Sequence, residues 1–164
     1  MIYPNIPQTG LEAFEYLPEG TNCQLVNDHI IMFPSLSIYH QEILGELLYQ
    51  LRPLRVLGTV LMRVDTYLDD KNIFLPDLMF IANSNKHIIK EHIYGAPDII
   101  IEILSPESAS LDENDKKDVY LKYGVKELWL VDPKTKKCKG HVNGEIIEST
   151  GQIKFSVVEH TVSF

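Results

Sequence analysis

One glutamate interrupts the most apolar segment of the chain, the run Ile99-Ile100-Ile101-Glu102-Ile103-Leu104. A run of β-branched residues without polar alternation predicts a strand that is buried on both faces of a sheet. A carboxylate in such a strand is costly unless a cation, a metal ion or hydrogen bonds compensate its charge. The segment therefore predicts a central strand in which Glu102 is chemically compensated, and it makes Glu102 the first candidate for a functional role.

Two Pro-Asp steps, Pro76-Asp77 and Pro97-Asp98, stand at the start of apolar segments. Residues four apart on a strand share a face, so Asp98 and Glu102 are expected to point the same way. Carboxylate oxygens suit Mg²⁺ or Mn²⁺, which favours a metal site. The spacing alone leaves other interpretations open, because either aspartate fits a residue that caps backbone donors and Glu102 fits a buried ion pair.

Length and composition fit one soluble globular domain, residues 1–164, since 45% of the residues are hydrophobic and 23% are charged. The net charge of −8 argues against a protein that coats nucleic acid by bulk attraction, although a local basic face remains open. Cys23 and Cys138 form no CxxC or Cys/His pattern, so we expect two reduced thiols. The N-terminal residues lack a signal-peptide pattern, and no apolar stretch approaches the ~20 residues of a membrane span. We therefore expect a cytoplasmic protein with no membrane partner.

Periodicity and turn residues predict a mixed α/β fold. Asn27-Asp28 is typical of a tight turn, which predicts a hairpin over residues 24–32 after an irregular start. Apolar spacing over residues 37–51 predicts a helix that Ser35 or Ser37 caps. Further strands are expected over residues 56–67, 73–81, 98–104, 126–132, 137–142 and 145–148, with a turn at residues 69–72, a loop over residues 83–96 and a hairpin turn at Asn143-Gly144. Pro76 predicts an edge or a bulge in its strand.

A second helix is expected over residues 111–123, directly after the central strand. Ser110 and Glu113 match a capping box, and Gly124 provides a C-terminal stop. Residues spaced by four share one helix face, so this helix is predicted to reach back toward the strand that carries Glu102. The residues on that face are Asp112, Lys116 and Tyr120.

Three stretches of the chain carry a family resemblance. They are F-L-P-D-L-M-F-I, G-A-P-D-I-I-I-E-I-L-S-P-E-S and D-E-N-D-K-K-D-V-Y-L-K-Y-G-V-K-E-L-W-L-V-D-P. In them the chain resembles the Uma-type family of restriction endonucleases, a bacterial branch of the PD-(D/E)XK nuclease superfamily. The resemblance runs in order from E-Y-L-P-E-G-T to the C-terminal hairpin, and residues 75–133 are its most specific part. It implies a restriction-endonuclease-like α/β fold, a mixed, twisted central sheet flanked by helices, with a C-terminal β-hairpin.

The resemblance also implies an endonuclease that hydrolyses DNA, with Asp77, Glu102 and Lys116 as catalytic residues. Asp77 and Glu102 would bind one Mg²⁺ or Mn²⁺. The lysine that usually follows the glutamate by two positions is replaced by Leu104. Lys116 resembles its migrated substitute, because it stands in the family pattern D-x-x-x-K-x-x-x-Y-x-x-x-G-V. The candidate supporting residues are Asp98, Gln24, His40 and Tyr120.

The chain departs from the family pattern at Gln24, where the family usually has a glutamate near the metal site. This change fits either a lower metal affinity or an altered activity. His40 fits a residue that orients water or phosphate, but the favoured interpretation is a satisfied helix histidine against the core. Two other functions stay open: a nuclease fold retained for binding nucleic acid or protein, and a purely structural ion pair between Glu102 and Lys116. DNA is the expected partner, and a homodimer would match the two strands of a duplex.

Overall fold

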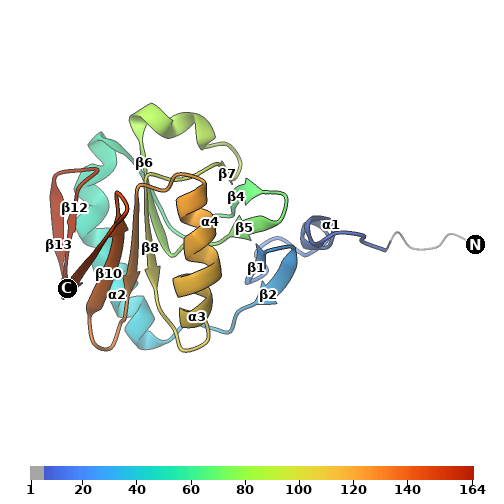
Figure 1. Cartoon of the computed structure of the whole chain (residues 1–164), viewed down its shortest axis with the longest axis horizontal. Coiled ribbons are helices and arrows are strands. Elements are labelled where there is room, and N and C mark those ends of the chain that lie inside the picture. The colour runs from blue at the N-terminus through green and yellow to red at the C-terminus, as the bar shows by residue number, and fades with distance from the viewer. Residues whose placement is uncertain (1–5) are drawn as a thin grey trace, which may run out of the picture.

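Two β-sheets form the framework of the fold, which a computed structural model describes for residues 6–164 (Figure 1). The first five residues of the N-terminal segment lie outside the described part of the chain. The larger sheet has six strands in the order β11-β10-β9-β8-β6-β3. Its strands are β3 (Gly58–Leu61), β6 (Leu78–Ala82), β8 (Ile99–Ile103), β9 (Glu127–Val131), β10 (Lys137–Val142) and β11 (Glu145–Thr150). The sheet is mixed, because β8 and β9 run parallel and the other neighbours are antiparallel.

A smaller sheet of five strands lies beside it, in the order β2-β1-β5-β4-β7. Its strands are β1 (Cys23–Val26), β2 (His29–Met32), β4 (Thr66–Asp69), β5 (Asn72–Phe74) and β7 (Ile93–Tyr94). The β1–β2 turn is the one that the sequence predicted, and both Asn27 and Asp28 take positive φ there. A separate two-stranded sheet, made of β12 (Gln152–Phe155) and β13 (His160–Ser163), follows the six-stranded sheet in the chain.

Helix α2 (Ile38–Leu51) covers one face of the six-stranded sheet, and α3 (Ala109–Leu111), the π-helical turn η3 (Asp112–Lys116) and α4 (Lys117–Lys122) cover the other (Figure 1). Helix α1 (Gly10–Glu15) lies against β1 and β2 of the smaller sheet, and two 3₁₀-helices, η1 (Arg52–Val56) and η2 (Asn83–Ile88), complete the helical elements. The apolar residues of α2 pack on Ile99, Ile101 and Ile103 of β8. Ile100, on the other face of β8, packs with Tyr120 of α4. The alternation of a strand therefore places Glu102 on the face that α4 covers.

Several predictions of local structure are confirmed. Ser37 caps α2 by accepting a hydrogen bond from the backbone N–H of His40. Asn143 and Gly144 both have positive φ and close the hairpin between β10 and β11, as a primed turn requires. Gly124 has a φ of +96° just after α4, where it ends the helix in the left-handed conformation. These positions need only local chemistry, which explains why the sequence predicted them.

The strands predicted over residues 56–67 and 73–81 are wrong as continuous elements. Each is divided between the two sheets: β3 and β6 pair in the larger sheet, and β4 and β5 pair in the smaller one. The division falls at Arg63 and Pro76, which form a backbone hydrogen bond of 2.9 Å from the Arg63 N–H to the Pro76 carbonyl. Arg63 has a φ of +50°, and Pro76 has no N–H to donate to a ladder, so both break regular strand pairing.

The capping box predicted at Ser110 and Glu113 is also wrong. The helix begins earlier, at Ala109, and Ser110 lies within it. Ser105 and Ser108 occupy the preceding turn instead, where each side chain accepts a hydrogen bond from the other's backbone N–H. The helix then widens into the π-helical turn η3 before it continues as α4.

Smaller corrections concern segments expected to be irregular. Helix α1 occupies part of the N-terminal region and β7 part of the loop over residues 83–96, while the hairpin of β12 and β13 extends beyond the predicted C-terminal hairpin.

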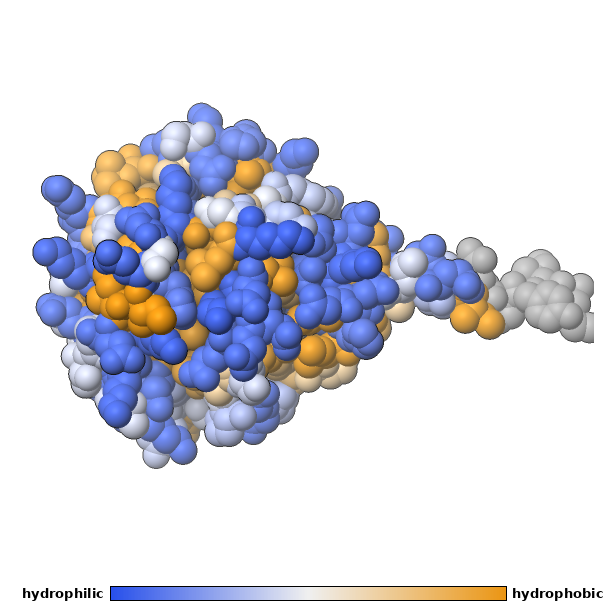
Figure 2. Space-filling model, viewed as in Figure 1, coloured by the Kyte–Doolittle hydropathy of each residue, from blue (hydrophilic) through white to orange (hydrophobic). Residues whose placement is uncertain are grey.

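Cys23 and Cys138 are buried and free. None of the helices in residues 6–164 combines the length and apolar character needed to span a bilayer. The face of the molecule seen in Figure 2 is mainly hydrophilic, with smaller apolar groups between the polar residues.

Candidate active site

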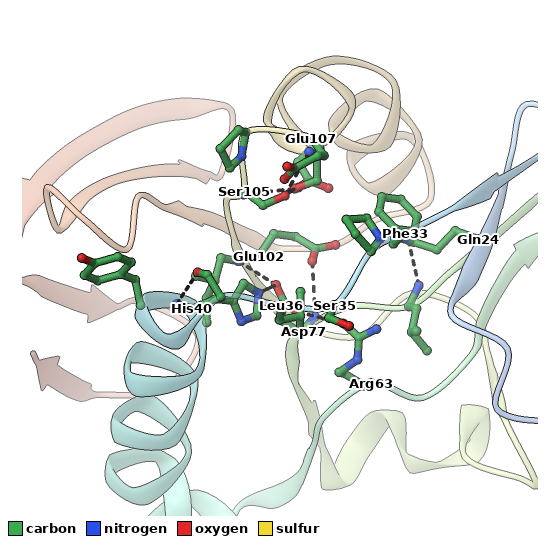
Figure 3. A pocket seen from close by; sticks show the side chains of 18 of the residues that line it. Gln24, Phe33, Ser35, Leu36, His40, Arg63, Asp77, Glu102, Ser105 and Glu107 are labelled. Atoms are coloured by element: carbon green, nitrogen blue, oxygen red, sulfur yellow. Dashed lines mark hydrogen bonds and ion pairs between the residues drawn. The ribbon is translucent and has the colours of Figure 1, made fainter.

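A cleft of about 310 Å³ lies at the point where the start of α2, the start of β6 and the end of β8 meet (Figure 3). Helix η3 and the Ser105–Ser108 turn form another wall. The sequence-predicted candidates that line the cleft are Gln24, His40, Asp77, Glu102 and Lys116. Asp77 and Glu102, 25 positions apart in the sequence, meet here because β6 and β8 are neighbours in the sheet.

Asp77 stands directly before β6 and is only 5% exposed. Its Oδ2 atom accepts a hydrogen bond of 2.8 Å from the backbone N–H of Ile103 and lies 3.1 Å from His40 Nε2. Its Oδ1 atom lies 3.3 Å from Nη1 of Arg63. The two oxygens are therefore unequal: Oδ2 is held by two close donors, and Oδ1 has one longer contact.

Glu102 is 2% exposed and approaches Asp77 from β8. Its Oε1 atom accepts a hydrogen bond of 2.7 Å from the Tyr120 hydroxyl and lies 2.6 Å from Lys116 Nζ. Its Oε2 atom has a 3.3 Å contact with the backbone N–H of Asp77 (Figure 3). Burial raises the pKa of Glu102 to about 7; the positive charge of Lys116 opposes this shift, and the negative charges of Asp112 and Asp77 add to it.

Lys116 is the cation that compensates Glu102, whereas the helix spacing predicted only that this face of the helix would reach the strand. Its Nζ atom also lies 2.8 Å from Oδ1 of Asp112, one turn earlier in the helix. Lys116 is 1% exposed. Burial alone would lower the pKa of Lys116, but the Asp112 and Glu102 carboxylates raise it above its ordinary value of 10.5. Lys116 therefore holds its proton and offers a positive charge rather than a free base.

Tyr120 and His40 hold the two carboxylates from opposite sides. Burial and the neighbouring Glu102 charge raise the pKa of the Tyr120 hydroxyl well above 10, so it remains a hydrogen-bond donor to Glu102. His40 is 2% exposed and contacts Asp77 through Nε2, while its Nδ1 atom is buried without a hydrogen-bond partner among the described residues. A neutral imidazole with its proton on Nε2 satisfies this arrangement, because Nε2 must donate to the carboxylate.

Gln24 and Asp98 have different places. Gln24 lines the cleft from β1, and its Oε1 atom accepts a hydrogen bond of 2.9 Å from the backbone N–H of Leu75. Asp98 does not line the cleft. It accepts hydrogen bonds from the Ala82 N–H at 2.8 Å and from Lys126 Nζ at 2.7 Å, which join the start of β8 to its neighbours. The structure thus brings Gln24 to the site and leaves Asp98 outside it.

Arg63 is a cleft residue that the sequence did not indicate. It lies in the linker between β3 and β4, and its guanidinium also contacts Oδ1 of Asn22 at 2.6 Å. No motif surrounds Arg63 in the sequence, since its position depends on where the chain passes from one sheet to the other. Asp112 was expected only on the helix face with Lys116, and its contact with the Lys116 ammonium makes it part of the same charged group.

The donor set of the cleft fits a hard divalent cation. Asp77 Oδ1 and Glu102 Oε2 are the less committed oxygens of the two carboxylates. Mg²⁺ is typically held by one or two carboxylates, with water and substrate phosphate completing its ligands. Residues 6–164 contain no group of three or more His, Cys, Asp or Glu side chains disposed to hold a metal, so the fit rests on these two carboxylates.

Comparison with known proteins identifies the family and the fold. A family model described as "Uma2: Putative restriction endonuclease" matches residues 11–155. A crystal structure described as "a putative nuclease belonging to DUF820", from Anabaena variabilis ATCC 29413, is 22% identical in sequence with a TM-score of 0.69, and the match covers 87% of this chain and 84% of that chain. No curated protein matches the chain. The family resemblance and the restriction-endonuclease-like α/β fold are thereby confirmed, and the family match supports a nuclease.

Proposed function

This chain belongs to the Uma2 family, and we propose that it is an endonuclease that needs a divalent cation to hydrolyse phosphodiester bonds of DNA. The observation that carries the proposal is the meeting of Asp77, Glu102 and Lys116 in one cleft. A buried Glu–Lys pair alone would need no second carboxylate beside it. Asp77 adds a negative charge next to Glu102, and a cation would offset the repulsion between the two.

Asp77 and Glu102 would hold Mg²⁺ or Mn²⁺. When bound, such a cation lowers the pKa of water and stabilises the negative charge that develops on the scissile phosphate. Lys116, protonated beside Glu102, would add a fixed positive charge at the cleft wall. Tyr120 and His40 would keep the two carboxylates oriented through Glu102 Oε1 and Asp77 Oδ2.

The mouth of the cleft offers contacts for a nucleic-acid backbone. Lys134 lines it, with its Nζ atom 5.5 Å from the centre of the Tyr39 ring. Ser35, Ser37 and Ser105 also line it, and their hydroxyls are suitable donors to phosphate oxygens. Lys134 and Arg63 would supply positive charge for a polyanion at this place in a chain of net charge −8, against one exposed acidic side chain, Glu107, in the same lining.

The test compares DNA cleavage by the wild type with that by Asp77→Asn and Glu102→Gln, each with Mg²⁺, with Mn²⁺ and with EDTA. Asp98→Asn is the matched control, because Asp98 follows a proline in the same way but lies outside the cleft. We expect cation-dependent cleavage by the wild type and the control, and a loss of about 100-fold or more in both cleft variants. Equal cleavage by all four proteins would contradict the proposal, and RNA of the same sequence tests the choice of nucleic acid.

A second candidate is a nuclease fold that binds nucleic acid or protein and cleaves weakly or not at all. Gln24 favours it, because an amide occupies the place of a family carboxylate and adds no charge to the two-carboxylate site. Calorimetric titration with Mn²⁺ separates the candidates. No Mn²⁺ binding together with DNA binding would select the binding module.

We also propose that two copies act together on a duplex, because the Asp77–Glu102 cleft would cut one strand at a time and a duplex has two strands to cut. Light scattering at increasing protein concentration tests this. Cleavage of both strands by a protein that stays monomeric would exclude it.

A further inference from the structure

Arg63 is placed between two acceptors at the wall of the cleft. Its Nη1 atom lies 3.3 Å from Asp77 Oδ1, and its Nη2 atom lies 2.6 Å from Asn22 Oδ1. Figure 3 shows its guanidinium on the side of Asp77 opposite to His40. The Arg63 side chain is 27% exposed, so its guanidinium borders both the buried carboxylate and the open cleft.

The backbone of Arg63 is held in an unusual conformation. Its φ of +50° belongs to the left-handed region, which is unfavourable for a residue other than glycine. Glycine at this position would avoid that cost but would remove the guanidinium. Strained residues of this kind occur where a side chain has a role that the surrounding fold enforces.

Arg63 and a divalent cation would compete for the same oxygen. Asp77 Oδ2 is already held by the Ile103 N–H and by His40, which leaves Oδ1 as the oxygen available to a cation. Arg63 is the cationic group that contacts Oδ1 among the described residues. Its contact with Asn22 is shorter and does not involve Asp77, so the guanidinium remains anchored if Oδ1 is released.

We propose that Arg63 is a substrate-binding residue that serves as the counter-ion of Asp77 in the cation-free cleft. It yields Oδ1 to the cation and then donates to a non-bridging oxygen of the DNA phosphate, with Asn22 holding it in place. The planar fork of donors in arginine suits phosphate, and the exchange gives Asp77 and Arg63 each a charged partner in both states. This inference rests on the proposed nuclease function, and it concerns a residue outside the Asp77–Glu102–Lys116 group.

The test uses Arg63→Gly, which removes the guanidinium and accepts the positive φ without strain. Arg63→Lys keeps the charge without the fork, and Arg55→Gln is the control for the loss of one positive charge, because Arg55 is exposed in η1 and does not line the cleft. Calorimetry with Mn²⁺ and binding of a short duplex with Ca²⁺ are measured for each protein.

We expect opposite effects on the two ligands. In Arg63→Gly, Mn²⁺ should bind about three- to tenfold more tightly, since a competing cation is removed, and the duplex should bind about tenfold more weakly. The affinities of Arg63→Lys for both ligands should lie between those of Arg63→Gly and the wild type. The Mn²⁺ affinity of Arg55→Gln should equal that of the wild type. If the role of Arg63 were purely structural, Arg63→Gly would bind both Mn²⁺ and the duplex more weakly.

Two results would overturn the inference, and they differ from failure of the nuclease proposal. Unchanged or weaker Mn²⁺ binding in Arg63→Gly excludes the counter-ion role, and unchanged duplex binding excludes the phosphate contact. Both can occur while the wild type still binds Mn²⁺ and depends on Asp77 for cleavage. If the wild type and Arg63→Gly both fail to bind Mn²⁺, and Asp77→Asn cleaves like the wild type, the nuclease proposal and the inference fail together.

Discussion

The backbone N–H of Asp77 lies 3.3 Å from Oε2 of Glu102, although 25 residues separate the two in sequence. The antiparallel register of β6 and β8, with Leu78 opposite Ile101, brings these neighbouring positions together at one edge. The Asp77 side chain returns a contact to the same strand by accepting from the Ile103 N–H. Two carboxylates are therefore locked side by side by the sheet rather than by a flexible loop.

Removal of the Lys116 ammonium should damage both stability and cleavage. Lys116→Met leaves Glu102 and Asp112 buried without their cation, which should cost about 3–5 kcal/mol in the free energy of unfolding. The double variant Lys116→Met/Glu102→Gln should recover part of that stability, because it removes one of the two uncompensated charges. Urea unfolding measures both effects.

The double variant tests whether Lys116 and Glu102, taken as a pair, are catalytic or only structural. We expect cleavage to stay lost in the double variant even where its stability returns. Recovery of both together would show that Lys116 and Glu102 form only a structural ion pair.

Gln24→Glu should restore a carboxylate at the cleft wall. One oxygen of the new side chain can still accept from the Leu75 N–H, while the other adds negative charge near Asp77 and Glu102. Mn²⁺ affinity should rise by about tenfold in calorimetry, since hard-cation sites tighten with each charged ligand. The melting temperature should fall in EDTA and recover with Mn²⁺. An affinity equal to that of the wild type would mean that residue 24 does not face the cation.

Asp98 should contribute to stability in a way that depends on pH. Burial acts to raise the pKa of Asp98, but hydrogen bonds from Lys126, Ala82 and Asn85 outweigh it and hold the pKa below its ordinary value of 3.8. The folded state thus binds the proton less readily than the unfolded state does. The stabilisation is fully present above pH 3.8 and is lost as the pH falls through the lower, folded-state pKa.

Asp98→Asn should therefore be less stable than the wild type at pH 7, by about 1–2 kcal/mol, and the difference should shrink below pH 3.8. Urea unfolding at pH 7, 5 and 3 measures it. A difference that stays constant across this range would show that the ionised carboxylate of Asp98 is not what stabilises the start of β8.

Gly140 should not accept a larger side chain. A Cβ atom there would lie 2.6 Å from the ring of Trp129, which is 1% exposed and cannot move aside freely. Gly140→Ala should cost about 1–3 kcal/mol in urea unfolding. Gly45→Ala is the matched control, since nothing lies near its added Cβ in α2 and alanine favours the helix, so its stability should rise by about 0.5–1 kcal/mol. Equal effects of the two substitutions would contradict the close contact with Trp129.

Part of the fold was predictable because its determinants are local. The central strand, α2 and the Asn143-Gly144 turn each depend on residues within a few positions of one another. The breaks at Arg63 and Pro76 could not be predicted in this way, because they depend on two sheets that the chain assembles from distant segments. The capping box at Ser110 failed because the Ser105 and Ser108 side chains already order the turn before the helix.

By itself, the sequence determined that Glu102 lies in a buried strand and that Asp112, Lys116 and Tyr120 share a helix face, since side-chain direction follows from local periodicity. Only the tertiary structure decided which residues meet there. It turned the helix onto Glu102, brought Asp77 beside it, placed Arg63 in the cleft and left Asp98 outside. These outcomes depend on strand order and register, which are set by the packing of segments far apart in the chain.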